Sequence, residues 1–418
     1  MKHAFSPFFS LVIAGTLLIV SCHRSDEEAP MGELSDPIQI ELRSEEKKMI
    51  ESDQAFAFDF FENVFREEAL DEDANFMVSP LSLSMALMMT SNGAGGDTKS
   101  AMRTTLHLDG YGDQEVNAYY KKLKEALLKT DPSTKLSIAN AIFTDQFVEI
   151  HKAFIKTNQS YFDATIRQVN FGDPATVDII NGWASEHTDG LIKEVIEETS
   201  PLDLMYLLNA IYFKGIWTTQ FDKKNTSREP FSQEDGGRAD VDMMHQTATF
   251  NYTADKSFQL VQLPYGNQAF SMMVLLPVEG LSLREAVAVL CSEGYWGGLQ
   301  SRLSEAEVTL SLPKFKTEYS KKLNDVLTAM GMGIAFSTMA DFSGMSDCPA
   351  FIEFVKQDTY ISTDEEGTEA AAVTVVAMRK NALGPQQVLF NANRPFLYLI
   401  QENSTGAILY MGAVKHFK

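Results

Sequence analysis

The chain has 418 residues, of which 44% are hydrophobic and 22% are charged, and its formal net charge at pH 7 is −22. This composition is that of a folded protein with a large core, and it excludes extensive disorder. The negative charge repels phosphate backbones and anionic lipids, so we expect neither nucleic-acid binding nor electrostatic binding to a membrane.

The N-terminal segment predicts export. A positively charged start is followed by an apolar run over 11–20, which is too short to span a bilayer as a permanent helix. Small Ser21 directly before Cys22 resembles a bacterial lipobox, in which Cys22 becomes the lipidated first residue of the mature chain. A plain signal peptide remains the alternative. We therefore expect a lipoprotein signal peptide over 1–22, with Cys22 as the site of lipidation.

The next segment, 23–44, is acidic and polar and contains prolines, as a solvated tether should. No linker-like stretch follows it, so we expect a single domain over 45–418. Membrane attachment is expected only through the lipid on Cys22. The expected location is the outer membrane, with the protein at the cell surface or extracellular, and the sequence leaves open which way the anchor faces.

Helices are predicted in the first half of the chain, over 44–69 and 80–94, and the glycines of 93–98 predict a helix end and a turn. Buried strands are predicted mainly later, over 136–144, 204–217, 258–266, 270–277 and 307–316. Because helices and strands do not alternate regularly, the class is α+β with a largely antiparallel sheet.

The sequence carries no catalytic or metal-binding motif: C-x-x-C, H-E-x-x-H, G-x-S-x-G and a phosphate-binding loop are all missing, and the seven His are scattered. We therefore expect no enzyme activity, no cofactor and no metal, although a triad built from distant residues stays open. Besides Cys22 the chain has only Cys291 and Cys348. Their pairing cannot be inferred in an exported chain, and we expect free thiols.

One segment, residues 365–385, carries two opposed local preferences. From Thr368 the letters TEAAA favour a helix start, with Thr as its cap, whereas from Val373 the letters VTVV favour a strand. Such a small-residue run between acids and a basic tail does not predict one stable element.

Six segments in unbroken order resemble successive blocks of the serpins, the serine protease inhibitors. They are "NFMVSPLSLSMALMM" (75–89), "LLNAIYFKGIWTTQF" (207–221), "LPKFKTEYSKKLNDVLTAMGM" (312–332), "ADFSGM" (340–345), "EEGTEAAAVT" (365–374) and "NRPFLYLIQENSTGAILYMGAV" (393–414). The chain is therefore identified from its sequence as a member of this family, as a bacterial lipoprotein form.

The resemblance implies one monomeric domain of helices around three sheets, with an exposed reactive-centre loop, about 365–390, over a large five-stranded sheet. It also implies a suicide mechanism against serine endopeptidases. The protease cleaves the loop, the loop inserts as a new strand, and the acyl-bound protease is distorted. The alternatives are a non-inhibitory binding or carrier protein and an inhibitor of cysteine proteases.

Insertion into a sheet makes a demand that the loop sequence can be tested against. An inserted strand alternates faces, so one parity must carry nothing that resists burial. Glu369 and Arg379 both fall on the odd parity. The even parity is uncharged throughout: Thr368, Ala370, Ala372, Thr374, Val376 and Met378.

The hinge of the family corresponds here to a run of acids, one glycine and small residues. Non-inhibitory members usually interrupt this hinge with bulky or charged residues, whereas here it is intact, which favours inhibition. Its residues are Glu365, Glu366, Gly367, Thr368, Glu369, Ala370, Ala371, Ala372, Val373 and Thr374.

Other family positions correspond one at a time. Ser79, Ser82 and Asn209 match a polar cluster where the central strands part, and Gln357 stands where the family usually has His. Gln still donates and accepts hydrogen bonds, but a pH-sensitive role is lost. Trp217 matches the tryptophan where the loop enters the sheet. No basic run resembles the heparin sites of some members, so we expect no activation by polyanions.

For the position of the reactive bond, the family's residue spacing and the side-chain preferences of proteases give different answers. The family's usual spacing of about seventeen residues from the start of the hinge places the bond between Asn381 and Ala382. Lys380 and Arg379 are chemically better bait for a trypsin-like protease, and Met378 suits elastase-like enzymes. The predicted partners are thus trypsin-like or elastase-like serine proteases, with cysteine proteases as a further class.

Overall fold

The computed structural model describes residues 1, 35–68, 74–368 and 387–417. The described residues from 35 onward form one compact unit. Among the described residues, no helix is both long enough and apolar enough to cross a membrane.

Helices dominate the first half of the chain. Six long ones precede the central strand β4, and shorter ones follow later. They are α1 (Ser44–Glu68), α2 (Pro80–Ser91), α3 (Gly96–Thr105), α4 (Asp113–Thr130), α5 (Lys152–Phe162), α6 (Ala175–His187), α7 (Leu283–Leu290), α8 (Tyr295–Gln300) and α9 (Asn324–Leu327). Local sequence explains several boundaries: Ser79 caps α2 with Pro80 in its first turn, and Ser282 and Glu285 form a capping box at α7.

The first of two sheets has six strands. In spatial order they are β10 (Phe315–Lys322), β11 (Lys356–Thr363), β12 (Gly367–Thr368), β4 (Met205–Ile216), β2 (Lys135–Asp145) and β3 (Thr165–Val169). Neighbours pair antiparallel except β2 and β3, which pair parallel. Five of the strands are full strands, and the two-residue β12 stands between β11 and β4.

The second sheet has nine strands. Eight follow the order β1 (Phe76–Val78), β15 (Ile408–Val414), β14 (Phe396–Glu402), β8 (Phe270–Pro277), β7 (Phe258–Tyr265), β6 (Arg238–Ala254), β9 (Ser304–Pro313) and β13 (Gln387–Asn391), and β5 (Ser227–Ser232) pairs with β6. Two of the three sheets that the resemblance implied are continuous here, because the long β6 pairs with β5 and β9 and then continues into a ladder with β7. The described strands therefore form two hydrogen-bonded sheets.

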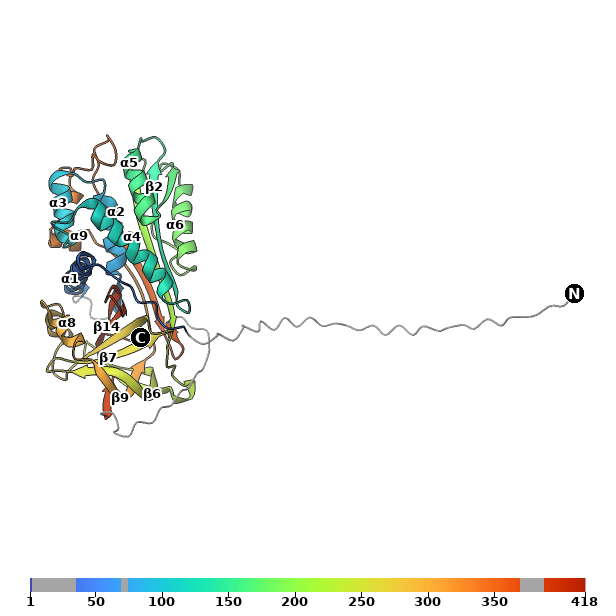
Figure 1. Cartoon of the computed structure of the whole chain (residues 1–418), viewed down its shortest axis with the longest axis vertical. Coiled ribbons are helices and arrows are strands. Elements are labelled where there is room, and N and C mark those ends of the chain that lie inside the picture. Colours follow the sequence, from blue (N-terminus) through green and yellow to red (C-terminus); the bar gives the residue numbers. More distant parts are fainter. Residues whose placement is uncertain (2–34, 69–73, 369–386, 418) are drawn as a thin grey trace. The chain divides into compact units, whose positions relative to one another are not determined.

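The core lies between the sheets and the helices. Strands β14 and β15 and nearly all of α2 are buried, as their continuous apolar letters predict. In Figure 1, α2 to α6 lie around the long strands of the six-stranded sheet, and β6, β7 and β9 lie at the other end of this unit.

The sequence predictions hold for the class and for most elements. The structure is α+β, both predicted early helices form, and the strands predicted over 136–144, 204–217, 258–266 and 270–277 form within a residue of their predicted ends or slightly longer. The prediction of a single strand over 307–316 is wrong. The strand is interrupted at Lys314, which separates β9 from β10, and these two strands belong to different sheets. The glycine-rich turn is present, and α3 begins inside it at Gly96.

Candidate functional site

The short strand β12 marks the site, because it stands between two strands that do not otherwise pair. Gly367 and Thr368 pair with Ile216 and Gly215 of β4, and Thr368 also pairs with Thr363 of β11. Beyond β12, and over their whole described lengths, β4 and β11 share no ladder. Among the described residues the sheet therefore has a break in its ladder between β4 and β11, which we call the gap, and a strand added there could pair with both edges.

Glu365 anchors the chain just before β12. It is only 2% exposed, and its Oε1 lies 2.6 Å from Lys314 Nζ and accepts a hydrogen bond of 2.7 Å from the Thr226 hydroxyl. Burial by itself raises the pKa of the Glu365 carboxyl, but the hydrogen bonds from Lys314 and Thr226 outweigh it and lower the pKa below its usual value. The carboxylate is thus held charged at the entrance to the gap.

An aromatic pair covers the entrance. The ring of Trp217 stacks on that of Tyr265 with centroids 4.4 Å apart, and the Trp217 indole N–H donates to the Asp364 carbonyl at 2.9 Å. The Tyr265 and Thr368 hydroxyls lie 2.7 Å apart in buried surroundings. Trp217, which was predicted at loop entry, is therefore in contact with the turn that leads into β12.

Gly367 is required by its close approach to β4. A Cβ atom at this position would lie 2.2 Å from the Gly215 carbonyl oxygen and 2.7 Å from the Ile216 Cα, both of which are backbone atoms. No side chain fits there without moving the strand apart from β4. The glycine therefore lets the hinge start inside the sheet.

The structure brings the four predicted polar residues together under the gap. The Gln357 side chain accepts from the Ser79 backbone N–H and donates to the Ser79 carbonyl, each at 2.9 Å. Ser82 donates from its hydroxyl to the side-chain oxygen of Asn209, so β4, β11 and the start of α2 are joined by side chains rather than by a ladder.

The sequence reasoning missed Asn140 of β2, which accepts a 2.6 Å hydrogen bond from the Asn209 amide and itself donates to the Phe162 carbonyl. It lies directly opposite Asn209 in the β2–β4 register. Two asparagines at inward positions of neighbouring strands were the only sequence signal.

The remaining predicted site residues lie outside the described part of the chain. These are Cys22, the hinge residues from Glu369 to Thr374, and the candidate bond residues Met378, Arg379, Lys380, Asn381 and Ala382. Cys291 and Cys348 are free thiols, as expected.

The structure does place a serine, a histidine and a carboxylate in line. Ser311 Oγ lies 2.9 Å from His245 Nδ1, and His245 Nε2 lies 2.7 Å from Glu229 Oε1. Ser311 is only 6% exposed, however, and its strand is paired on both sides by β6 and β13, so a substrate carbonyl cannot reach the hydroxyl. We assign these contacts to holding β5, β6 and β9 together.

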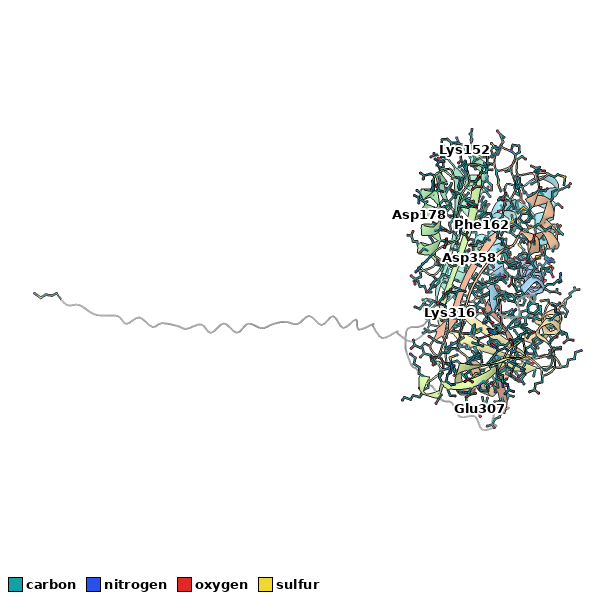
Figure 2. The ribbon with its side chains drawn as sticks, turned by 180° about the vertical axis from the view of Figure 1, so that it is seen from behind. Lys152, Phe162, Asp178, Glu307, Lys316 and Asp358 are labelled. Carbon is teal, nitrogen blue, oxygen red and sulfur yellow. The ribbon has the colours of Figure 1, made fainter. Side chains whose placement is uncertain are left out.

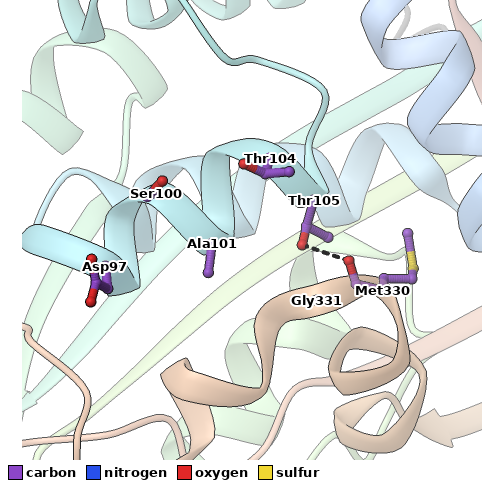
Figure 3. A pocket seen from close by; sticks show the side chains of 7 residues that line it. All are labelled: Asp97, Ser100, Ala101, Thr104, Thr105, Met330 and Gly331. Carbon is purple, nitrogen blue, oxygen red and sulfur yellow. Dashed lines mark hydrogen bonds between the residues drawn. The ribbon is translucent and has the colours of Figure 1, made fainter.

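Elsewhere the described surface offers little for a small ligand. A cavity of about 310 Å³ lies between α3 and residues 330–331, where Thr105 donates to the Met330 carbonyl at 3.1 Å (Figure 3). Its only charged lining residue is Asp97. No group of three or more potential metal ligands occurs among the described residues.

Comparisons with known proteins agree on one family. The model of the family described as "Serpin (serine protease inhibitor)" matches residues 51–416. An uncharacterized serpin-like protein of Thermococcus kodakarensis is 33% identical over 381 residues, which cover 90% of this chain and 87% of that protein. Intracellular coagulation inhibitor 2 of Tachypleus tridentatus is 35% identical over 356 residues, covering 83% and 86%. The crystal structure of the thermophilic serpin tengpin in its native state superposes with a TM-score of 0.81 at 31% identity, covering 92% of this chain and 97% of that one.

Proposed function

The chain belongs to the serpin family, whose members are generally protease inhibitors, and from this premise we propose that it is a suicide-type inhibitor of serine endopeptidases. The protease serine oxygen attacks the carbonyl carbon of the bait residue, the peptide C–N bond breaks, and the new amino terminus leaves. An ester then joins the two proteins. Insertion of the freed loop between β4 and β11 carries the protease away before water hydrolyses that ester.

The observation that carries the proposal is the register set by β12. Continuing the pairing of Thr368 with Gly215 places Glu369 opposite Lys214 on β4. After insertion in this register, the one acid of the inserting segment would meet a lysine on the sheet face opposite to that of Thr368. The inward face is fixed by Thr368, whose hydroxyl contacts buried Tyr265, so the uncharged even parity is the one that would be buried.

The same register matches the polar cluster. Thr374 falls opposite Asn209 of β4 and, by the pairing of Thr368 with Thr363, opposite Gln357 of β11. It is the one hydroxyl among the newly inserted inward residues, and it meets the one polar layer beneath the gap. Ala370 and Ala372 fall beside the apolar Phe213 and Ile211. The charge, polarity and size of the loop side chains therefore all fit the same register on β4 and β11. In a carrier protein that never inserts its loop, no such match is needed.

The class of target protease depends on the residue just before the reactive bond. We propose trypsin-like proteases as targets through Lys380 or Arg379, elastase-like proteases as the second class, and Asn381–Ala382 as the bond that the family spacing favours. We also propose that the protein acts as an outer-membrane lipoprotein anchored at Cys22 and facing outward, where it meets foreign proteases as a monomer. The N-terminal sequence supports this location.

The test is incubation with trypsin and, separately, with an elastase, followed by a denaturing gel and mass spectrometry of the released C-terminal peptide. We expect a complex that survives denaturation and a new N-terminus at 380, 381 or 382. Clean loop cleavage without a complex for every serine and cysteine protease tried would favour the binding or carrier function instead.

A further inference from the structure

The solvent-facing side of the edge strand β13 has features that loop insertion does not explain. β13 pairs in parallel with β9, so Gln387 lies opposite Glu307 and Leu389 lies opposite Thr309. Thr309 in turn lies opposite Thr247 of β6. We call the surface formed by Thr247, Glu305, Glu307, Thr309, Gln387 and Leu389 the end face. Figure 2 shows Glu307 at the end of the unit opposite Lys152, the first residue of α5.

The two sides of these strands differ sharply in burial. On the inner side Val308 and Leu310 of β9 and Phe390 of β13 are fully buried. On the end face the side chains of Thr309 and Gln387 are exposed and Glu307 is half-buried. The end face is thus the outer layer of the sheet, and no described element covers it.

At the centre of the end face lies an apolar side chain. Leu389 is 63% exposed, and it is the one exposed large hydrophobic side chain in the described strands. Beside it the hydroxyls of Thr247 and Thr309 lie 3.3 Å apart, so they partly satisfy each other. An exposed leucine among small hydroxyl side chains gives a surface that can pack against another protein.

The charge of the end face has one sign. Its only ionisable side chains are the carboxylates of Glu305 and Glu307, and none of its residues is a lysine or an arginine. Glu307 Oε1 accepts a 2.8 Å hydrogen bond from the Gln387 side-chain amide, which fixes this carboxylate beside the first described residue of β13. A partner that packs here meets negative charge at the point where the chain enters β13.

The length of chain before β13 determines which partner comes to this surface. Gln387 follows Asn381 by six residues, and an extended chain spans at most about 3.3–3.6 Å per residue, or about 20 Å in all. A globular protease of about 200 residues has a radius of gyration of about 16 Å and a diameter of about 40 Å. A protease whose active site holds the bond at Asn381 is therefore wider than its distance from β13, and part of its surface lies against the end face.

We infer that the end face is a second contact surface for the protease held by the loop, with Leu389 as its apolar centre and Glu307 as its charged rim. This inference rests on the proposed function and adds a second source of specificity to the bait residue. Because the surface is acidic, it favours trypsin-like proteases that carry basic side chains beside the active site.

The test of the charge uses the full chain with a cationic and an anionic trypsin, which accept the same bait residues. The measured quantity is the second-order rate constant at which each trypsin cuts the loop, followed as loss of the intact chain. Glu307→Gln should slow the cationic trypsin about threefold at low salt and less at high salt, and it should not slow the anionic trypsin. The matched control is Asp178→Asn on α6, which is exposed and distant from Glu307 in Figure 2 and should leave both rates unchanged.

The test of the apolar centre is Leu389→Asn, which should slow both trypsins about threefold at any salt concentration, because an apolar contact is not screened. Its control is Leu202→Asn, since Leu202 is 93% exposed but precedes β4 and lies outside the end face. An unchanged thermal unfolding midpoint shows that each variant is folded. Equal rates for all four variants and the unchanged protein would overturn this inference alone. A loop that is cut at these different rates without trapping the protease would overturn the proposed function and leave the contact surface standing.

Discussion

Glu365 shows how one buried carboxylate fixes where the loop begins. Its contacts with Lys314 and Thr226 tie the hinge to the residue before β5 and to the residue between β9 and β10. Replacing it by Gln in Glu365→Gln keeps the shape but removes the charge, so the uncleaved protein should lose about 1–3 kcal/mol of stability at pH 7. Thermal unfolding of both proteins measures this difference.

The pH dependence of that difference has a definite sign. Because the folded-state pKa of Glu365 lies below its usual value of about 4.3, the stabilisation is present above that pH and is lost as the pH falls through the folded-state pKa. The two unfolding midpoints should therefore converge in acid. The matched control is Glu366→Gln, whose partner Lys223 is largely exposed, and it should change the midpoint little at any pH. If the difference between the unfolding midpoints of the unchanged protein and of Glu365→Gln were the same at every pH, this assignment would be contradicted.

Because successive side chains of an inserted strand point to opposite faces of the sheet, the same substitution at two neighbouring loop positions should have different effects. In the projected register Ala372 would lie opposite buried Ile211 and Thr359, with no cation beside them. Ala371 would lie opposite Tyr212 and Tyr360 on the other face, where Lys135 and Lys316 lie over the two tyrosine rings. Ala372→Glu would bury a carboxylate without a partner, at a cost of several kcal/mol. We expect it to abolish the proposed trapping, so that trypsin cleaves the loop and is released.

Ala371→Glu is the matched control, since Glu369 already occupies this parity and Lys316 lies over the Tyr360 ring. It should still trap trypsin. The number of inhibitor molecules consumed per protease inactivated measures both variants, and an equal value for the two would mean that the loop does not insert in the projected register.

The elements that the sequence predicts well have a clear apolar pattern. Apolar runs predict β4, β7 and β8, which are buried or half-buried throughout, and α1 has helical spacing, whereas α2 is an apolar run buried on nearly every side. The break at Lys314 was not predicted, because Pro313 and Phe315 are both apolar enough to continue a strand, and only tertiary pairing assigns them to different sheets.

The residues of the polar cluster could be predicted from the sequence, but the strand pairing around them could not. Ser79, Ser82, Asn209 and Gln357 could be named from the family resemblance, and the structure brings them together. That β12 already lies in the sheet, and that β4 and β11 share no ladder, depends on long-range strand pairing that no local pattern encodes.

In the described part of the whole molecule, only the two-residue β12 stands between β4 and β11, so the six-stranded sheet has room in its pairing for one further strand. Adding a strand gains about 1 kcal/mol for each ladder hydrogen bond and more for each buried Val or Met, and the ordering of the segment offsets part of this. Since the donors and acceptors of β4 and β11 are presented already, the added strand need not come from the same chain. A free peptide with the sequence of residues 369–378 should bind in the gap.

Binding of that peptide to the uncleaved protein should have two linked effects. At a peptide concentration about a hundred times its Kd, the folded state gains about 2.7 kcal/mol, which raises the thermal midpoint by several degrees. The peptide should also abolish trapping, so that trypsin cuts the loop and leaves, because the place of the loop is taken. A peptide with Glu at the position of Ala372 should do neither, since its charge would face the buried side. A peptide that raised the midpoint without abolishing trapping would bind elsewhere, and the gap between β4 and β11 would then not be the acceptor of the loop.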